Sequence, residues 1–300
     1  MKKRITIGAL LVFAAVLAVY GKESERPSGA ADNSGADSVG ETKVFTLPGG
    51  VHMEMVYVAP GSFQMGSENG VDDEKPVHKV TLTNGYWIGK YPVTQAQWNA
   101  LVSAMDVSFD GGRPVAFFSR NGIGRDLVSG LDTSDFPMEN ISWNDCTALV
   151  AALNKEDREG WRWSLPTEAQ WEYACRAGST EPYAGDGYLD DMGWYDDNCD
   201  MTHPVGQKRA NAWGFHDTHG NVWEWCADWY GEYGRPATDP RGPASGKFRV
   251  LRGGSWSRSA RGCRSAYRGR CSPDSRVCSY GLRLCCSAEP RSERPAAARP

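Results

Sequence analysis

Residues 252–256 read Arg-Gly-Gly-Ser-Trp and residues 281–284 read Gly-Leu-Arg-Leu, two short motifs near the end of the chain. The interval between them, residues 257–280, reads SRSARGCRSAYRGRCSPDSRVCSY and contains six Arg but only one Asp. We call it the displayed segment. It shows neither the period of a strand nor that of a helix. Because buried irregular backbone would leave polar groups unpaired, we expect this segment to run over the surface.

The composition predicts a globular, loop-rich protein. The 300 residues, 40% of them hydrophobic and 12 of them Trp, can bury a large core in one or two domains. The 34 Gly and 17 Pro indicate many ordered loops. Nine cysteines are an odd number and none forms a Cys-x-x-Cys pair, so we expect neither a complete disulfide framework nor structural zinc.

The N-terminus predicts export to the bacterial cell envelope or surface. Three cations at positions 2–4 precede an apolar run at 5–20, the pattern of an export signal over residues 1–20. A membrane anchor is the alternative, and we expect membrane contact only there. Residues 17–21, Leu-Ala-Val-Tyr-Gly, are similar to a lipoprotein processing site, except that Tyr20 stands where Cys is required. Without these cations the chain is more acidic than its net charge of −4, so no nucleic-acid partner is expected.

The remaining chain divides into three predicted regions. A flexible linker of small and acidic residues covers 21–44, one folded domain covers 45–287, and a disordered Pro/Ala/Arg tail covers 288–300. Within the domain the patterns predict strands at 53–59, 61–65 and 77–89, helices at 94–105, 143–155 and 167–177, and an inserted loop at 106–135. Thr94 and Thr167 are the predicted N-caps of two helices, and Gln170 completes a capping box.

Five sequence blocks together resemble the formylglycine-generating enzyme family, also called the sulfatase-modifying-factor domain. They include Leu-Pro-Thr-Glu-Ala-Gln-Trp-Glu-Tyr-Ala and Gly-Asn-Val-Trp-Glu-Trp, and they lie at 55–66, 91–98, 165–174, 220–225 and 252–256. The resemblance implies an α+β fold of the C-type-lectin-like kind, rich in loops and with short antiparallel sheets.

The resemblance also locates the redox site of the family. Members that oxidise a cysteine carry two copper-binding thiols shortly after the Gly-Gly-Ser-aromatic motif, at the positions of Arg258 and Cys263 here. Only the second thiol is present, and Cu(I) prefers two thiolates, so we expect neither copper nor catalysis. The competing hypothesis is a copper-dependent cysteine-oxidising enzyme that uses Cys263 with Cys271 or Cys278, or an inactive relative of such an enzyme.

The displayed segment is also similar to the C-terminal region of the variable proteins that retroelements diversify by mutating adenines. Changes at the first two positions of an AAC codon cannot produce Lys, Gln, Glu, Met or Trp, and residues 257–280 contain none of these. Framework positions shared with ordinary family members are Arg264, Ser265, Ala266, Arg268, Pro273, Asp274 and Arg276. The predicted diversified, ligand-binding positions are Ser257, Arg258, Ser259, Arg261, Gly262, Tyr267, Gly269, Arg270, Cys271, Ser272, Ser275, Val277, Cys278, Ser279 and Tyr280.

These residues predict a binding protein for a protein or other surface ligand. Tyr and Arg are frequent anchors of binding surfaces, and the excess of Arg favours an acidic partner. The framework arginines can instead be tied into the fold. A solvated loop without a ligand is the plainer interpretation.

A calcium site is the remaining prediction from the resemblance. The family's calcium loop corresponds to residues 217–224, and the implied ligands are Asp217, Gly220, Val222 and Glu224, which offer the oxygen atoms that a hard cation prefers. The alternative is a Trp-packed turn in which Glu224 pairs with an arginine such as Arg252.

Overall fold

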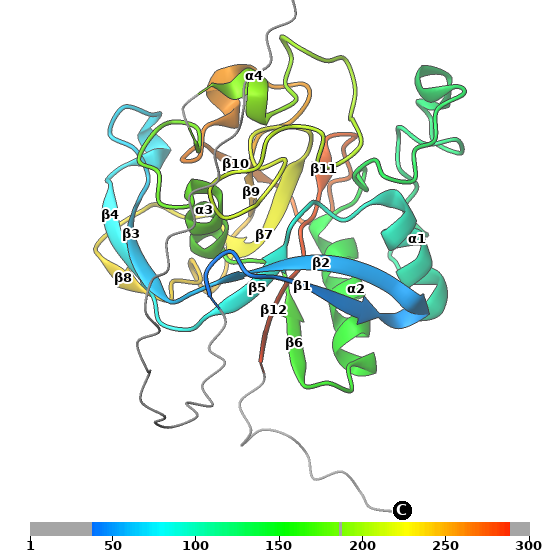
Figure 1. The fold of residues 1–300 in the computed structure, drawn as a ribbon, viewed down its shortest axis with the longest axis horizontal. Helices are drawn as coiled ribbons and strands as arrows, with labels where there is room; N and C mark the ends of the chain where they lie inside the picture. Colours follow the sequence, from blue (N-terminus) through cyan, green and yellow to red (C-terminus); the bar gives the residue numbers. More distant parts are fainter. Residues whose placement is uncertain (1–37, 186–187, 289–300) are drawn as a thin grey trace, which may run out of the picture. The chain divides into compact units, whose positions relative to one another are not determined.

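The computed structural model describes residues 38–185 and 188–288. Figure 1 shows the strands and α-helices of these ranges, connected by long loops. The strands are β1 (Thr42–Leu47), β2 (Val51–Val58), β3 (Gly61–Met65), β4 (His78–Leu82), β5 (Tyr86–Gly89), β6 (Trp161–Ser164), β7 (Trp223–Trp229), β8 (Ala237–Thr238), β9 (Arg249–Arg252), β10 (Arg268–Cys271), β11 (Tyr280–Gly281) and β12 (Cys285–Ala288). The helices are α1 (Gln95–Ala104), α2 (Trp143–Glu156), α3 (Glu168–Arg176) and α4 (Leu189–Met192).

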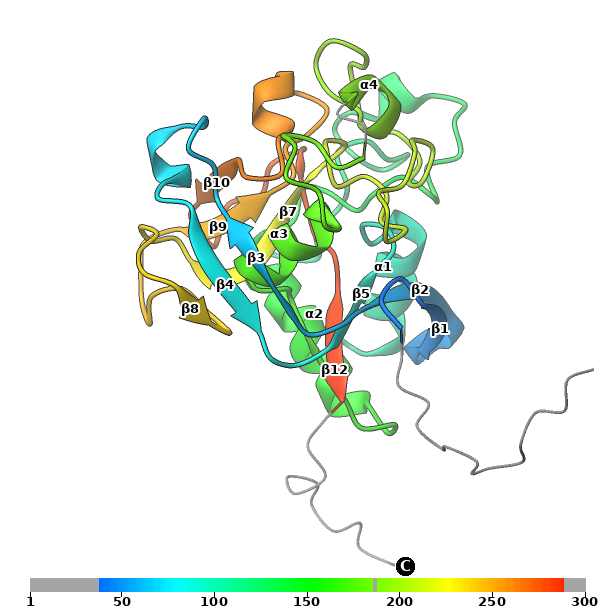
Figure 2. The same ribbon diagram turned by 60° about the vertical axis from the view of Figure 1, so that its left-hand side comes forward.

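The strands of the described ranges form three sheets. Their orders are β1-β2-β5-β12-β6, β10-β9-β7-β11 and β3-β4-β8. Neighbouring strands are antiparallel, except that β11 runs parallel to β7 and β8 runs parallel to β4. The last strand, β12, lies between β5 and β6 (Figure 1), so the end of the domain completes the sheet that its first strands begin. Figure 2 shows β12, in red, from a second direction.

The three longer helices confirm the sequence predictions to within two residues. The Thr94 hydroxyl accepts a hydrogen bond from the Gln97 N–H at 3.2 Å and caps α1. Thr167 and Gln170 form the predicted capping box at the start of α3. Because these caps satisfy N–H groups that have no partner inside the helix, they fix where each helix begins.

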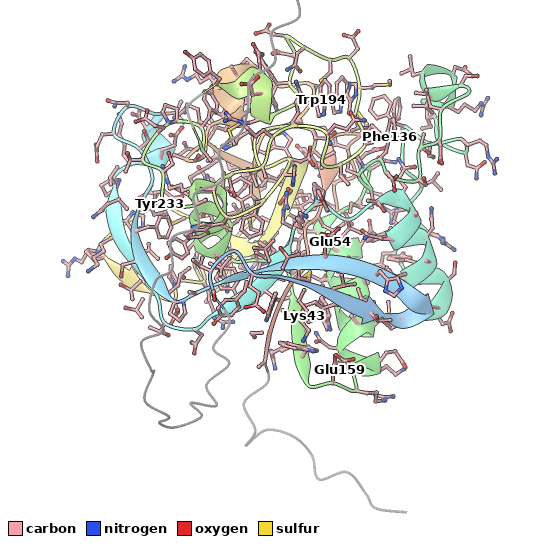
Figure 3. All side chains as sticks on the ribbon, in the orientation of Figure 1. Lys43, Glu54, Phe136, Glu159, Trp194 and Tyr233 are labelled. Carbon is pink, nitrogen blue, oxygen red and sulfur yellow. The ribbon has the colours of Figure 1, made fainter. Side chains whose placement is uncertain are left out.

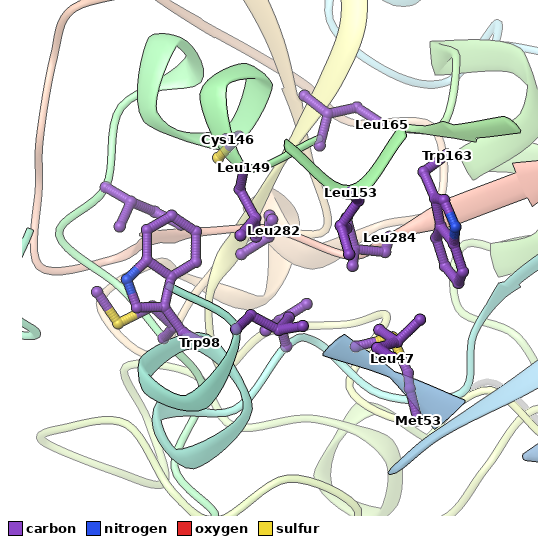
Figure 4. Close-up of a cluster of buried hydrophobic side chains, with 14 of the residues drawn as sticks. Leu47, Met53, Trp98, Cys146, Leu149, Leu153, Trp163, Leu165, Leu282 and Leu284 are labelled. Atoms are coloured by element: carbon purple, nitrogen blue, oxygen red, sulfur yellow. The ribbon is translucent and has the colours of Figure 1, made fainter. Parts of the chain in front are cut away.

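The main core lies between α1, α2 and the five-stranded sheet (Figure 4). Trp98 of α1, Leu149 of α2 and Leu284 are fully buried in it. Leu284 belongs to the Gly-Leu-Arg-Leu motif, so the residues that follow the displayed segment are anchored by apolar packing.

Two predicted domain boundaries were wrong. The linker was expected to extend to residue 44, but β1 begins at Thr42 because its backbone pairs with β2. The tail was expected to begin at 288, but Ala288 pairs with Trp161 at the end of β12. The export signal and most of the linker and tail lie outside the described residues. Within those residues no helix has the length and apolar character needed to cross a membrane.

Candidate ligand-binding surface

The displayed segment is joined to both edges of the four-stranded sheet, since β10 is one edge strand and β11, which begins at Tyr280, is the other. The chain leaves β9 at Arg252, returns as β10 beside β9, and enters β11 beside β7. The prediction that residues 257–280 lack regular structure was therefore wrong in part, since the segment contains β10 and a 3₁₀ turn at Ala260–Cys263. The sequence of β10, Arg-Gly-Arg-Cys, does not alternate apolar and polar residues. An ion pair and a glycine, rather than aliphatic side chains, pack this strand against the domain.

The three framework arginines are tied to carboxylates outside the segment. Arg264 forms two hydrogen bonds with Glu74, at 2.8 and 2.5 Å, and Arg268 forms two with Glu168, at 2.6 and 2.8 Å. Arg276 binds Asp145 of α2 through two bonds of 2.7 Å. Such paired contacts orient a guanidinium firmly. The prediction that these residues belong to the fold is confirmed.

Buried charges lie beneath the framework arginines. Burial alone would raise the pKa of Glu168, but Arg268 and Arg252 lower it below its usual value. Arg252 is itself fully buried and pairs with Glu172 of α3. It also donates to the carbonyl groups of Ser265, Ala266 and Tyr267 within the displayed segment. The Arg-Gly-Gly-Ser-Trp motif therefore holds residues 265–267 in place.

The other three arginines of the segment, Arg258, Arg261 and Arg270, are exposed. Among the described residues none of them pairs with a carboxylate. The Arg258 guanidinium lies 5.8 Å from the centre of the Trp223 ring, and that of Arg270 lies 4.6 Å from the centre of the Tyr230 ring. These arginines keep their charge available to a partner.

Most predicted ligand-binding positions reach the surface. Ser257, Arg258, Ser259, Arg261 and Arg270 are exposed, and Tyr267, Gly269, Cys271, Ser272, Ser275, Val277, Cys278 and Tyr280 are half-buried.

Gly262 and Ser279 are exceptions, since both are buried. A Cβ on Gly262 would lie 3.3 Å from the Arg258 Cβ, and the Ser279 carbonyl accepts the Trp223 N–H. The prediction that Gly262 and Ser279 bind ligand is therefore corrected: both residues belong to the structure of the domain.

The structure gathers one group of these positions around Trp223. The Tyr267 ring lies 6.0 Å from the Trp223 ring, and a Cβ on Gly269 would lie 3.0 Å from it. Tyr280 packs edge-on against Trp225 at 5.4 Å, and burial together with Cys271 raises the pKa of Tyr280 to about 12.

Arg270 lies apart from this group. It alternates with Gly269 along β10 and therefore points to the opposite face of the sheet. There it contacts Tyr230 instead of Trp223. The predicted surface is thus divided between two faces, with the tyrosines on one and Arg270 on the other.

Sequence reasoning did not identify the aromatic residues that support this surface, the buried Trp223 and Trp225 and the half-buried Tyr230. Trp223 and Trp225 alternate along β7, and such a period of two is typical of one face of a strand. Trp223 lies within the predicted calcium loop, and this assignment concealed the pattern.

The geometry of the predicted calcium loop does not fit a calcium ion. Both carboxylate oxygens of the buried Glu224 accept hydrogen bonds from Arg283, at 2.7 and 2.9 Å, and one also accepts the Trp171 indole N–H at 2.6 Å. Asp217 is buried and accepts the Gly206 N–H, and burial raises its pKa. A cation beside Glu224 would be repelled by the guanidinium. Glu224 pairs with an arginine as the alternative proposed, but the partner is Arg283 and not Arg252.

The residues at the family's copper site do not fit copper. Cys263 is fully buried, which raises the pKa of its thiol to about 12 and favours the protonated form. Arg258, which stands at the position of the first thiol, is exposed. Cu(I) requires thiolates, so Cys263 alone does not make a copper centre. All nine cysteines are free.

The fold and this surface define an α+β scaffold with a loop-rich body. The family described as the sulfatase-modifying factor enzyme 1-like domain matches residues 42–288. The chain therefore belongs to this family, and the relatives named below include formylglycine-generating enzymes.

One curated relative is the formylglycine-generating enzyme of Streptomyces coelicolor, which is 31% identical over 76% of this chain and 88% of that protein. The Chlamydia caviae serine/threonine-protein kinase pkn1 is also 31% identical, over 82% of this chain. The chain spans only 40% of the length of that kinase.

This chain matches two solved structures over nearly the whole length of each. Treponema denticola variable protein 1 has 30% identity and a TM-score of 0.66, and it covers 82% of this chain. PvdO from Pseudomonas aeruginosa has 29% identity and a TM-score of 0.70, and it covers 84%. The predicted fold, a C-type-lectin-like fold of the formylglycine-generating-enzyme type, is confirmed.

Proposed function

We propose that this protein is an exported, non-catalytic binding protein whose displayed segment is a diversified ligand-binding surface. The proposal is supported by the structural similarity to Treponema denticola variable protein 1, whose name describes it as variable. We extend that description to this chain. The ligand is an unidentified protein or other surface molecule at the bacterial cell envelope.

The division among the six arginines of the displayed segment carries this proposal. Arg264, Arg268 and Arg276, the framework positions, are held by carboxylates of the domain. Arg258, Arg261 and Arg270, the predicted variable positions, are exposed and unpaired within the described part of the chain. A surface can change its sequence without unfolding only when structural and contact residues are separate. This separation is what a diversified binding surface requires.

The exposed charge supports an acidic ligand. Three guanidinium groups without a carboxylate partner in the described residues attract carboxylates or other anions. Arg258, which lies over Trp223, is on the same face as the tyrosines, whereas Arg270 is on the other face. The tyrosines supply rigid contact area. Tyr267 and Tyr280 are half-buried and present part of each ring. We expect these aromatic rings to contact the apolar part of the ligand.

Sequencing the gene in many isolates tests the proposal directly. We expect variation concentrated at the predicted ligand-binding positions, with Gly262 and Ser279 less variable because they are buried. The variable codons should be derivable from an adenine-rich template. Variation spread evenly over residues 42–288 would contradict the proposal and favour the enzymatic or structural hypotheses.

The enzymatic alternative predicts a different response to copper. We expect the unchanged chain to retain no Cu(I) at Cys263 in the presence of a competing chelator, since one buried thiol is a poor site. Arg258→Cys supplies the missing first thiol of the family motif and should add one bound Cu(I) per chain. Stoichiometric copper in the unchanged protein that is lost in Cys263→Ser would instead support a cysteine-oxidising enzyme.

A further inference from the structure

The strand β3 has one edge that no other strand of the described residues covers. It is the first strand in the sheet β3-β4-β8 and pairs with β4 alone. In an antiparallel pair the backbone N–H and C=O groups of alternate residues point away from the partner strand. No hydrogen bond from another part of the described chain reaches the backbone of residues 61–65 on this free edge. A row of such unpaired groups is a template for a further strand.

The other free edges of the described sheets are short or charged, whereas β3 is neither. The edge strands β8 and β11 have two residues each. The edge strands β1, β6 and β10 each carry a basic side chain, respectively Lys43, Arg162 and Arg270. Short length and basic side chains protect an edge from pairing with another chain. The sequence of β3, Gly-Ser-Phe-Gln-Met, contains neither a charge nor a proline, so its edge is open to pairing.

A cavity of about 800 Å³ follows this edge. Ser62 and Gln64 point to one face of β3 and Phe63 points to the other, and all three line the cavity. A cavity that is lined from both faces of a strand lies along its edge. Residues 178–182, which follow α3, also line it. The five residues of β3 span about 17 Å, enough for a short extended segment to lie beside them.

The face of β3 toward α3 is aromatic. The Phe63 ring lies 5.1 Å from the ring of Tyr173 of α3, and Tyr173 packs edge-on against Trp213 at 5.0 Å. All three rings line the cavity and are half-buried. Tyr233, which lies between β3 and α3 in Figure 3, donates its hydroxyl hydrogen to Glu168 at 3.1 Å. The aromatic rings are therefore held on an ordered support and offer apolar contact area.

The cavity also carries unpaired negative charge. Arg176 and Arg264, the cations that line it, are both paired with buried glutamates. Glu68 and Glu181 also line it, and both are exposed without a cationic partner among the described residues. These carboxylates attract basic side chains.

We propose that the free edge of β3 binds an extended segment of a partner protein, which adds to the sheet as a further strand. Backbone hydrogen bonds with β3 supply the affinity. Alternate side chains of the segment supply the specificity, since apolar ones contact Phe63 and Tyr173 while a Lys or Arg meets Glu181. No predicted ligand-binding position of the displayed segment lines this cavity. The edge of β3 is therefore a second binding site, which goes beyond the proposed function.

Selection from a library of random decapeptides displayed on phage tests the proposal. The target is the full chain, and peptides that also bind the Thr180→Trp variant are discarded. Thr180 is exposed and lines the cavity, so a Trp side chain there fills the space that the peptide needs. We expect the remaining peptides to alternate apolar and polar residues and to contain Lys or Arg. Ala151→Trp, the matched control, places the same side chain on an exposed position of α2 and should leave peptide binding unchanged.

Methylation of the backbone nitrogens of a selected peptide gives a sharper test. Each methyl group removes one hydrogen-bond donor without changing a side chain. Measured by fluorescence polarisation on the full chain, methylation at alternate residues, those that face β3, should raise the Kd about tenfold. Methylation at the intervening residues should have little effect.

Three outcomes would overturn the proposal. One is a selection that yields no peptide dependent on the open cavity, and another is a methylation scan without alternation. The third is binding of maltohexaose that Thr180→Trp abolishes while no peptide binds, which would assign the cavity to a neutral oligosaccharide. None of these outcomes depends on the ligand of the displayed segment.

Discussion

Replacing Arg283 with methionine is expected to lower the free energy of unfolding by about 3–5 kcal/mol. Arg283 is almost fully buried and holds both oxygens of Glu224, and it also donates to the carbonyl groups of Gly89 and His216 at 2.8 Å. Methionine fills much of the same volume but leaves the Glu224 carboxylate with only the Trp171 indole. An uncompensated buried charge is among the largest single costs in a folded protein.

Urea unfolding of the purified chain measures this loss. Arg261→Met is the matched control, since Arg261 is exposed and its replacement should change stability by no more than about 0.5 kcal/mol. The same experiment with and without EDTA tests the calcium hypothesis, because a bound ion would stabilise the folded chain by mass action. We expect EDTA to have no effect. A small loss in Arg283→Met, or a lower stability in EDTA, would show that Glu224 has another partner.

Local signals predicted much of the scaffold. Thr94 and Thr167 fixed the starts of two helices because capping depends on residues within one turn. The period of apolar residues located α2 in the same way. These features are encoded by neighbours along the chain, so the sequence alone was sufficient.

Long-range pairing could not be predicted in this way. Arg283 and Glu224 are 59 positions apart, and Arg264 and Glu74 are 190 positions apart. The family resemblance placed Arg264 among the framework positions but did not give its partner, Glu74. Glu224 illustrates the consequence, because an exposed Glu in a loop could bind a cation whereas the buried Glu224 requires Arg283.

The structure of the displayed segment was harder to predict, because its strand β10 is held in place by tertiary contacts. β10 contains two arginines and a glycine, and no local pattern indicates a strand. Arg268 is held by Glu168 and Gly269 lies against Trp223, and both contacts come from distant parts of the chain. The sequence therefore predicted which positions are framework but not which ones face each other.

Glu139 leads to the second large prediction, a loss of stability as the pH rises. Its side chain is fully buried, and one oxygen accepts the Phe118 N–H at 2.8 Å while the other has no hydrogen-bond partner in the described residues. Burial raises the pKa of Glu139 from 4.5 to about 8. In this range the folded chain binds a proton at Glu139 that the unfolded chain has lost.

Stability should therefore fall as the pH rises from about 4.5 to 8, by up to about 1.4 kcal/mol per pH unit from this group alone. Asp228, whose pKa burial and Glu168 raise to about 7, acts in the same direction. Glu139→Gln keeps the shape and the Phe118 contact but cannot ionise. At pH 5 we expect the free energy of unfolding of this variant to equal that of the unchanged protein. At pH 9 we expect the variant to be more stable by roughly a few kcal/mol, as the size of the pKa shift implies.

Urea unfolding between pH 5 and pH 9, in the presence of a thiol reductant, measures the difference. Glu54→Gln is the matched control, because Glu54 is partly exposed and binds Lys90 at 2.9 Å. Its pH dependence should follow that of the unchanged chain, whereas Glu139→Gln should show a flatter curve. Parallel curves for Glu139→Gln and the unchanged protein would mean that Glu139 is already ionised at pH 5 in the folded chain. Phe118 donates its N–H to this carboxyl group and packs its ring against Trp256. Ionisation of Glu139 at high pH would therefore loosen the inserted loop where it joins the displayed segment.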